Sequence, residues 1–590
     1  MSASLPVRRI ASIAAILVAA TLLRGLWLTA DPPAQHPVGI VWHDEGAWTH
    51  NARNRALFGV WRTDEWNPVF VAPVFVALEY TAFRAFGVGT WQARLVPVAS
   101  GLAALALLMA GLSALAGWRA ALVGGWLLAT EFTWVMWNRA ALMESTMAAL
   151  IVAAWAAYAM VERRPVWGLV AGAAATLAFF TKASAAFFVA ALVADAMVTL
   201  VLARLPHLRS RLGVAAPTPE IARGARLTVA GLVVTGLVIG VLFVWPHWSE
   251  YQFYNWQMSV ERKPSYDFAS FRDRASWLPL VHDFFTRMWL TLAVAAVAIA
   301  GVLARWRDAR PAERLLVLWV FLGFLELTIH DAGNERRYVM FIPAFVALAA
   351  LVAGSGTRWL PESLATAHWK SRLAGLPFVL ALGYLVFGSA MRPAFLGRIL
   401  IGEYYPAVWT AAGLSVATSI LLFGFWTRAI AWLSTRRVTA TGAAVLVVLS
   451  LAWNLGQYGR WAASRTYLNY QASVAIGVRL PRGTLVQGKL ANGLALENEI
   501  RPLFVGRGFG NYADRFDRDD ARYILTYDLP WEGYESQRGL ISEILERYPQ
   551  RQLIGTFDVD ETPGVDRAVL IDKRPGSSPA AGPGSSRARD

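Results

Sequence analysis

The sequence contains no cysteine among its 590 residues. Disulfide bonds, thiolate-ligated metals and cysteine nucleophiles are therefore excluded. Charged residues are also scarce, because Asp, Glu, Lys and Arg make up 16% of the chain, against about 25% in soluble domains. This shortage of charge disfavours a soluble globular protein.

Hydrophobic residues take the place of the missing charge. They form 56% of the chain, which also has 27 tryptophans and a mean hydropathy of +0.41. Indole rings favour the two interfaces of a membrane. The net charge of +15 could indicate a nucleic-acid partner, but the basic residues stand in short loops between apolar runs. We therefore interpret the chain as an α-helical polytopic membrane protein with no nucleic-acid partner.

The first apolar run orients the chain. Arg8 and Arg9 precede the apolar stretch 10–30. This stretch is longer than the apolar core of a typical signal peptide, so an uncleaved first helix is favoured over a cleaved signal. Basic residues remain on the cytoplasmic side, which predicts that Asp44 emerges on the opposite face.

The number of membrane crossings must be odd between two segments that lie on opposite sides of the membrane. The basic segment from Arg204 to Arg226 is expected in the cytoplasm, so an odd number of helices separates it from Asp44. Six apolar candidates lie between them: 69–87, 92–116, 119–137, 140–161, 166–182 and 183–203. The weakest is 69–87, since it contains Pro73 and would bury Glu79 and Arg84 at about 2.5–3.5 kcal/mol each. We predict an interfacial helix there. With the first helix and the spans 227–245, 284–304, 315–330, 338–354, 374–391, 406–427 and 440–458, about thirteen transmembrane helices result.

The segment His43-Asp44-Glu45-Gly46 places two carboxylates at a membrane boundary, where ionisable groups generally have a function. The predicted topology brings further polar residues to the same face, any one of which is equally well explained as an interfacial anchor. They are Arg94, Asn138, Arg139, Glu144, Lys182, His330, Arg336, Arg337, Tyr338 and the loop 246–283.

Carboxylates and cations together suit an anionic lipid headgroup beside a reacting hydroxyl. Arginine binds phosphate through its planar fork, and lysine adds a point charge. Such contacts strengthen as a leaving phosphate gains charge. A carboxylate within hydrogen-bond reach of the attacking hydroxyl can take its proton. The pattern therefore predicts transfer of a sugar from a polyprenyl-phosphate donor.

The segment 43–59 resembles the first external loop of GT-C membrane glycosyltransferases. It is similar to that of the protein O-mannosyltransferases (glycosyltransferase family 39) and of the 4-amino-4-deoxy-L-arabinose lipid A transferases. Further stretches resemble these families in the same order: Ala93-Arg94-Leu95-Val96-Pro97, Asn138-Arg139 to Glu144, Thr181-Lys182, and Arg337-Tyr338 with Pro343. The resemblance covers roughly residues 8–355.

The resemblance implies a GT-C bundle and an inverting transfer, with Asp44 as catalytic base and Glu45 orienting it or pairing with an arginine. It makes a group of residues candidates for the donor phosphate or for ion pairing with the acidic loop: Arg94, Arg139, Lys182, Arg336, Arg337 and Tyr338. Supporting roles are expected for His43, Glu65, Glu144 and His330. The acceptor is a lipid, a glycan or a protein.

Two features depart from these families. The aminoarabinose transferases carry Glu-Lys before the prolines of this loop, whereas the sequence here is Asp64-Glu65-Trp66-Asn67-Pro68. The extra repeat domains of eukaryotic protein mannosyltransferases have no counterpart. No cofactor is expected. A divalent cation could bind between Asp44 and Glu144 through oxygen ligands, but the arginines already supply positive charge, which favours a metal-independent enzyme.

Composition divides the chain into a transmembrane domain (1–459, with an external catalytic loop at 31–91), an extracytoplasmic α/β domain (460–574) and a disordered tail (575–590). In the second domain we predict a helix over 465–480 and strands near 484–488, 502–505, 522–527, 552–557 and 568–571. The glycine-rich stretch 506–511 is interpreted as a flexible loop rather than a phosphate cradle.

Two other functions fit parts of the sequence. Glu131, Asp195 and Glu326 lie within apolar segments, as in a transporter or lipid flippase. A membrane-anchored assembly subunit could use the Asp-Glu pair only to bind a partner. The crowding of charge at one face favours the glycosyltransferase, in the inner (plasma) membrane with an extracytoplasmic site.

Overall fold

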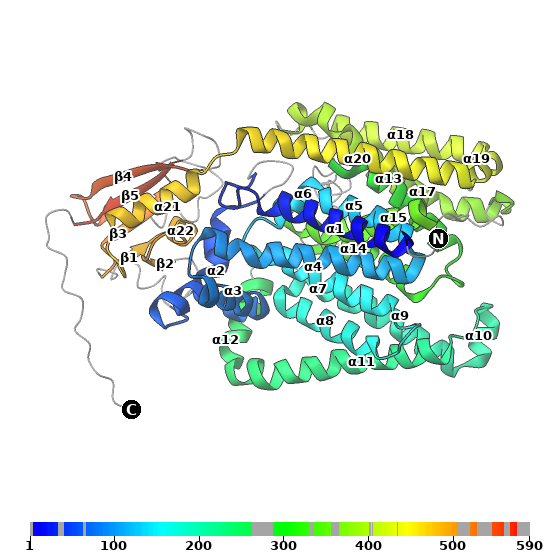
Figure 1. Cartoon of the computed structure of the whole chain (residues 1–590), viewed down its shortest axis with the longest axis horizontal. Coiled ribbons are helices and arrows are strands. Elements are labelled where there is room, and N and C mark those ends of the chain that lie inside the picture. The colour runs from blue at the N-terminus through cyan, green and yellow to red at the C-terminus, as the bar shows by residue number, and fades with distance from the viewer. Residues whose placement is uncertain are drawn as a thin grey trace.

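The computed structural model describes residues 4–33, 40–62, 66–261, 287–330, 335–355, 365–400, 403, 405–433, 435–504, 520–527, 546–559 and 567–574. A bundle of long helices makes up most of the molecule, and a small domain with a β-sheet lies at one of its ends (Figure 1). The chain begins at the other end of the bundle.

Within the described residues, each of the thirteen predicted spans contains a helix. In chain order these are α1 (Ser4–Gly25), α4 (Thr90–Ala116), α5 (Trp118–Thr130), α7 (Met143–Ala159), α8 (Trp167–Thr181), α9 (Ala186–Arg204), α11 (Pro219–Ile239), α13 (Trp289–Ala304), α14 (Pro311–His330), α15 (Ile342–Ser355), α17 (Trp369–Leu400), α18 (Tyr405–Gly424) and α20 (Arg436–Ser464). Shorter helices connect them: α6 (Phe132–Trp137), α10 (Pro206–Leu212), α12 (Trp248–Gln252) and α19 (Trp426–Leu433).

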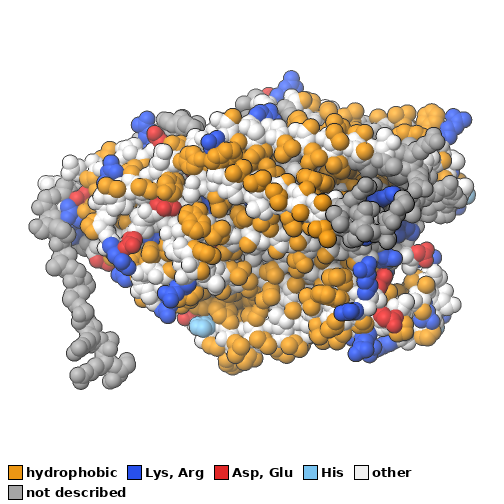
Figure 2. Space-filling model, viewed as in Figure 1, with side chains coloured by type: hydrophobic (Ala, Val, Ile, Leu, Met, Phe, Trp, Pro, Cys, Tyr) orange, Lys and Arg blue, Asp and Glu red, His pale blue; other side chains and the backbone are white. Residues whose placement is uncertain are grey.

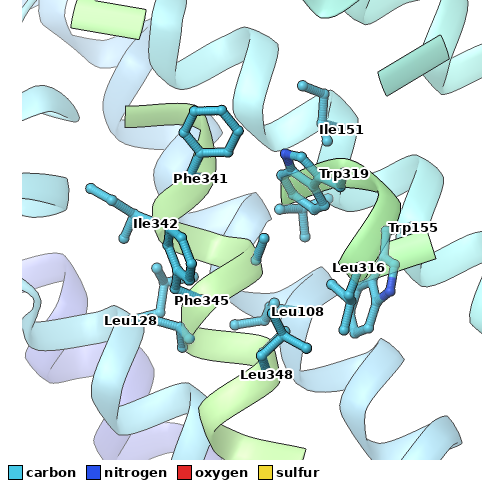
Figure 3. Close-up of a cluster of buried hydrophobic side chains, with 14 of the residues drawn as sticks. Leu108, Leu128, Ile151, Trp155, Leu316, Trp319, Phe341, Ile342, Phe345 and Leu348 are labelled. Atoms are coloured by element: carbon cyan, nitrogen blue, oxygen red, sulfur yellow. The ribbon is translucent and has the colours of Figure 1, made fainter. Parts of the chain in front are cut away.

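Length and apolar composition qualify six helices of the described part as membrane spans, and three more are apolar but shorter. The chain is therefore a multi-pass membrane protein. Its bundle is organised around α15, whose span is 94% buried, whereas the span that contains α11 is only 11% buried and lies at the edge. Leucine and aromatic side chains from α4, α5, α7 and α14 pack around α15 (Figure 3).

The segment 69–87 forms α3 (Pro73–Phe86), which begins at a proline suited to the first helical turn. Its 14 residues extend about 21 Å, less than the roughly 30 Å hydrocarbon core of a bilayer. The helix packs against α2 (His43–Phe58), α4 and α8 at the end of the bundle that carries the small domain. Its position at the membrane interface remains a prediction.

Figure 2 shows a cluster of Lys and Arg side chains at the end of the bundle away from the small domain, and further ones on the small domain itself. The Arg9 guanidinium lies 5.8 Å from the ring centre of Trp118. Arg310 pairs with Glu162 at 3.9 Å and donates to the Leu115 carbonyl. The turns around residues 115, 162 and 310 therefore lie together with the N-terminal segment. The predicted topology puts all of them on the same side of the membrane.

The small domain contains α21 (Leu468–Arg479), α22 (Lys489–Gly493) and a five-stranded sheet in the order β2-β1-β3-β5-β4. The strands are β1 (Leu485–Gln487), β2 (Arg501–Leu503), β3 (Tyr523–Tyr527), β4 (Gln552–Asp558) and β5 (Arg567–Asp572). β1 is parallel to β2 and β3, while β5 runs antiparallel to β3 and β4. All five predicted strands and the predicted helix are confirmed. The domain boundary at 460 stays a prediction; α20 continues four residues past it, to Ser464.

Candidate active site

Helix α2 carries the Asp-Glu pair and lies between the bundle and the C-terminal domain (Figure 1). Asp44 and Glu45 stand in its first turn, where negative charge complements the helix dipole. The helix ends at Gly59, which adopts the left-handed conformation with φ 77°. Although α2 is rich in polar residues, much of its surface is buried, because α3 covers one side and α22 the other.

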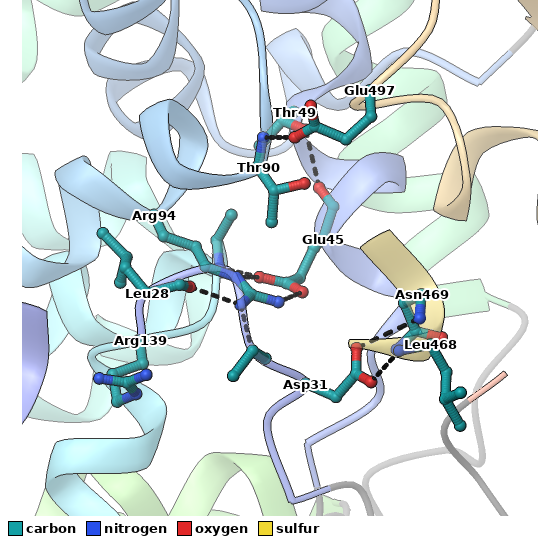
Figure 4. Close-up of polar contacts among 12 residues, drawn as sticks. Leu28, Asp31, Glu45, Thr49, Thr90, Arg94, Arg139, Leu468, Asn469 and Glu497 are labelled. Atoms are coloured by element: carbon teal, nitrogen blue, oxygen red, sulfur yellow. Dashed lines mark hydrogen bonds and ion pairs between the residues drawn. The ribbon is translucent and has the colours of Figure 1, made fainter. Parts of the chain in front are cut away.

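Glu45 forms a bidentate ion pair with Arg94 of α4. The two carboxylate oxygens accept from Nε and Nη2 of Arg94 at 2.8 and 2.6 Å, and both side chains are buried (Figure 4). Glu45 Oε1 also accepts from the backbone N–H of Ala141 at 2.7 Å. The remaining Arg94 contacts run to the carbonyls of Leu28 and Ala30. Of the alternatives that the sequence left open for Arg94, ion pairing with the acidic loop is the one present.

Asp44 has a different environment from its neighbour. Its side chain is 19% exposed, and Oδ1 lies 3.6 Å from Nε2 of the buried His43. His43 Nδ1 is in turn 3.4 Å from the hydroxyl of Tyr527, the last residue of β3. The adjacent carboxylates thus differ in access, since Glu45 is held inside the bundle while Asp44 reaches the surface beside the C-terminal domain.

Arg139 caps the C-terminal end of α1. Its Nη1 donates to the carbonyls of Leu23, Arg24 and Leu26, and its Nη2 donates to the carbonyl of Trp27. Cationic side chains commonly satisfy the last carbonyls of a helix in this way. The guanidinium also lies 4.6 Å from the ring centre of Trp461. Arg139 therefore makes structural contacts at the position where a phosphate role was expected.

Lys182 and Arg337 each contact a carboxylate at the same end of the bundle. Lys182 Nζ lies 2.6 Å from Glu144 Oε1 and retains 15% exposure. Arg337 Nη1 lies 3.3 Å from Glu326 Oε1. Tyr338 is fully buried against Phe324 and Phe341. Glu65 lies outside the described residues, as do the side chains of His330 and Arg336 and the glycine-rich stretch 506–511.

Arg53 and Glu79 also belong to this region, although the sequence predicted no catalytic or binding role for either. Arg53 of α2 is fully buried, and burial lowers its pKa to about 9, which leaves it charged at neutral pH. Glu79 of α3 is also fully buried, and neither carboxylate oxygen has a hydrogen-bond partner. Burial, and secondarily the charge of Glu45, raises the pKa of Glu79 well above its usual value. For Glu79 the available signal was a charged residue on a helix face that small and apolar residues otherwise fill; the polar helix α2 offered no such signal for Arg53.

The carboxylates inside apolar segments have partners. Asp195 accepts from Arg314 Nε at 2.7 Å and from the Tyr158 hydroxyl at 2.8 Å. Glu326 pairs with Arg337, and Glu131 accepts from the backbone N–H of Trp134 at the start of α6. In the part of the chain that the structure describes, no cluster of three or more His, Asp or Glu could hold a metal ion. Metal independence stays a prediction.

Comparison with known proteins identifies the fold of the chain. Residues 71–220, which contain Arg94, Arg139, Glu144 and Lys182, match the family model described as Dolichyl-phosphate-mannose-protein mannosyltransferase. The apo structure of ArnT from Cupriavidus metallidurans is similar over 97% of this chain and 99% of its own, with a TM-score of 0.51 and 19% identity. The chain has the GT-C fold.

Other GT-C structures are similar at lower scores. ArnT from the same organism bound to undecaprenyl phosphate has a TM-score of 0.49 and 19% identity, covering 98% of this chain and 99% of that one. The oligosaccharyltransferase of Archaeoglobus fulgidus in the apo form has a TM-score of 0.42 and 12% identity, covering 88% and 69%. No curated protein sequence matches the chain. The GT-C resemblance predicted from the sequence is confirmed.

Proposed function

We propose that this protein is an integral membrane glycosyltransferase that moves a sugar from a polyprenyl-phosphate donor to an acceptor hydroxyl, with inversion at the anomeric carbon. The GT-C fold and the match of residues 71–220 to a family that uses dolichyl-phosphate mannose support this class of reaction. The observation that carries the proposal is the difference between the two carboxylates of the Asp-Glu pair. Arg94 and Ala141 bind Glu45, whereas Asp44 in the same helical turn is partly exposed.

Asp44 acts as the general base. In an inverting transfer, its carboxylate accepts the proton of the acceptor hydroxyl while that oxygen attacks the anomeric carbon. The bond from this carbon to the phosphate oxygen breaks, and the polyprenyl phosphate leaves with the bonding electrons. A positioned base of this kind contributes typically 10²–10⁴-fold to the rate.

Lys182 and Arg337 are the described side chains best suited to the leaving phosphate. Arg94 and Arg139 each donate four hydrogen bonds within the protein, so a phosphate could recruit them only by displacing those bonds. Lys182 and Arg337 pair with the carboxylates of Glu144 and Glu326, and the Lys182 side chain keeps 15% exposure through which a phosphate can approach. A cation beside a departing phosphate stabilises the charge that develops on it.

The reaction takes place on the extracytoplasmic face of the inner membrane. The basic turns at one end of the bundle support a cytoplasmic location for that end. The site and the C-terminal domain lie at the opposite end, next to α2 (Figure 1). A single cysteine at the exposed position Val478 should react with a membrane-impermeant maleimide in intact spheroplasts, because the chain has no other cysteine. Labelling only after lysis would contradict this orientation.

The transfer itself is tested with purified protein in proteoliposomes. Polyprenyl phosphates carrying radiolabelled mannose or aminoarabinose serve as donors, and a total extract of cell-envelope lipids and proteins serves as acceptor. We expect labelled product from one donor with the wild type and none with Asp44→Asn. Equal product from both proteins would contradict the role of Asp44. Transport of either labelled donor across the bilayer without cleavage would instead support a flippase.

A further inference from the structure

The turn formed by residues 495–500 of the C-terminal domain contacts helix α2 through Arg53. Nε of Arg53 donates to the Ala495 carbonyl at 2.9 Å, and Nη2 donates to the carbonyls of Asn498 and Ile500 at 2.7 and 3.0 Å. Arg53 Nη1 donates to its neighbour Asn54. A fully buried guanidinium is thus surrounded by carbonyl oxygens of a single turn.

The same turn contacts helix α4 through Glu497. Glu497 Oε1 accepts from the backbone N–H of Thr90, the first residue of α4, at 2.6 Å (Figure 4). The first N–H groups of a helix have no partner within it, so this carboxylate both caps α4 and complements its dipole. Arg94, which pairs with Glu45, stands four residues further along α4.

The turn is itself held in one conformation. The side-chain amide of Asn498 donates to the carbonyls of Ser473 and Leu494 at 2.9 and 2.7 Å, and its oxygen accepts from the Ile500 N–H at 3.3 Å. Ser473 belongs to α21, which Asp31 caps by accepting from the N–H groups of Leu468 and Asn469. The turn is therefore connected to the rest of the C-terminal domain.

These contacts connect α2 and α4 at two separate places. α2 and α4 are the two helices joined by the Glu45–Arg94 pair, and the turn bridges them a second time through Arg53 and Glu497. We propose that the 495–500 turn positions Asp44, so that the C-terminal domain is an obligatory part of the active site; this rests on the proposed function. Arg53 and Glu497 are positioning residues, since they act through the orientation of α2 and α4.

Variants of Arg53 and Glu497 can remove the contacts to the turn and to α4 while changing little else. Arg53→Lys keeps the charge but loses the planar fork that reaches several carbonyls. Glu497→Gln keeps an oxygen that can accept from Thr90, whereas Glu497→Ala does not. Arg482 provides the control, because it also links the C-terminal domain to the last turn of α2, donating to the Leu57 carbonyl, but is 64% exposed.

The test combines kinetics with a distance measurement. Donor cleavage is measured in proteoliposomes with the polyprenyl-phosphate sugar that the wild type uses. Spin labels are attached to cysteines at Val60, after α2, and Val478, in α21, which are 41% and 83% exposed. The absence of native cysteine confines the labels to these two positions.

We expect Arg53→Lys and Glu497→Ala to lower kcat by about tenfold or more, because a misplaced base loses part of the 10²–10⁴-fold that a positioned base typically contributes. The donor KM should stay within about twofold, because the side chains proposed to bind the donor phosphate, Lys182 and Arg337, lie outside the turn. Glu497→Gln and Arg482→Ala should retain the wild-type kcat. The distance distribution should be narrow in the wild type and broad in Arg53→Lys.

Unchanged kcat in both Arg53→Lys and Glu497→Ala would overturn the proposal, as would a loss confined to KM. If the wild type cleaves no donor, the proposed function fails, and the distance distribution alone then decides whether the turn orients α2. An equally narrow distribution in the wild type and in Arg53→Lys would overturn that orientation.

Discussion

The two ends of the helical bundle hold their ionic groups in different surroundings. At the end next to the C-terminal domain, Arg94 and Arg139 are buried; Arg94 is bound by the Glu45 carboxylate and two backbone carbonyls, and Arg139 by four backbone carbonyls. At the other end, the turns also carry exposed pairs: Arg310 pairs with Glu162 while both side chains remain 48% and 36% exposed, although the neighbouring Arg314 and Asp195 form a pair that is only 14% and 2% exposed. Exposed pairs contribute about 0–1 kcal/mol, whereas removing one partner of a buried pair costs about 3–5 kcal/mol.

This difference indicates what each end does. The exposed arginines of the far end remain in contact with water and suit the orienting role of cytoplasmic loops. The buried arginines of the domain end fix helices α1, α2 and α4 relative to one another, and so build a rigid frame around Asp44. We propose that charge at one end orients the chain in the membrane and that charge at the other fixes the helices around Asp44.

The largest effect is expected from Glu45→Ala. It leaves the buried guanidinium of Arg94 without its carboxylate, which should cost about 3–5 kcal/mol of folding free energy. Glu162→Ala, at the exposed pair of the other end, should cost less than about 1 kcal/mol. Thermal unfolding of the two variants in the same detergent measures the difference. Equal losses would show that the buried pair and the exposed pair contribute equally to the free energy of unfolding.

The next largest effect is expected from Gly46→Ala. A Cβ at Gly46 would lie 1.8 Å from the carbonyl oxygen of Asn492 in α22, so α2 and the C-terminal domain would have to separate. Overpacking of this kind costs typically 1–3 kcal/mol. Gly236→Ala in α11 is the control, because no atom lies within 4 Å of its added Cβ. A melting temperature unchanged by Gly46→Ala would show that the contact is not tight.

Lys182 tests whether the domain end also binds the donor. Lys182→Gln removes a point charge, and loss of a hydrogen bond to a charged group, about 1.5–3 kcal/mol, should raise the donor KM roughly tenfold or more. Lys182→Arg should retain most of the affinity, and Arg209→Gln at the far end should leave KM unchanged. Donor-concentration series in proteoliposomes give these values. If Lys182→Gln lowers only the melting temperature, the Lys182–Glu144 pair is structural.

Glu79 gives the smallest effect and a dependence on pH. Its pKa is raised in the folded protein, so the native state binds a proton that the unfolded state releases above its usual pKa of 4.5. The stability of the wild type should therefore fall as pH rises. Glu79→Gln removes this cost, and its melting temperature should exceed that of the wild type by a margin that grows to a few degrees between about pH 5 and 8. A margin independent of pH would show that Glu79 is not protonated in the fold.

Much of the fold could be predicted from the sequence, because hydrophobic length and the distribution of arginine determine the helices and their direction. The strands of the C-terminal domain were also predictable from short β-branched and aromatic runs such as 523–527. The ion pair between Glu45 and Arg94 was foreseen only as one of two alternatives.

The carbonyl contacts could not be predicted. Arg139 binds the end of α1, more than a hundred residues away, and Arg53 binds a turn more than four hundred residues away. Backbone carbonyls carry no residue identity, so sequence patterns do not reveal which of them a buried arginine will meet. The end of α20 at Ser464 was also not predicted, because the helix continues through polar residues.

The division of labour between Asp44 and Glu45 is tested most directly by comparing Asp44→Asn with Glu45→Gln for both melting temperature and sugar transfer. The account predicts that Asp44→Asn unfolds within about 2 °C of the wild type, because its side chain is partly exposed, and transfers sugar at least about a hundredfold more slowly. Glu45→Gln should lower the melting temperature, because the buried Arg94 loses a charged partner. Transfer that survives in Asp44→Asn, or a loss explained by unfolding alone, would contradict the account.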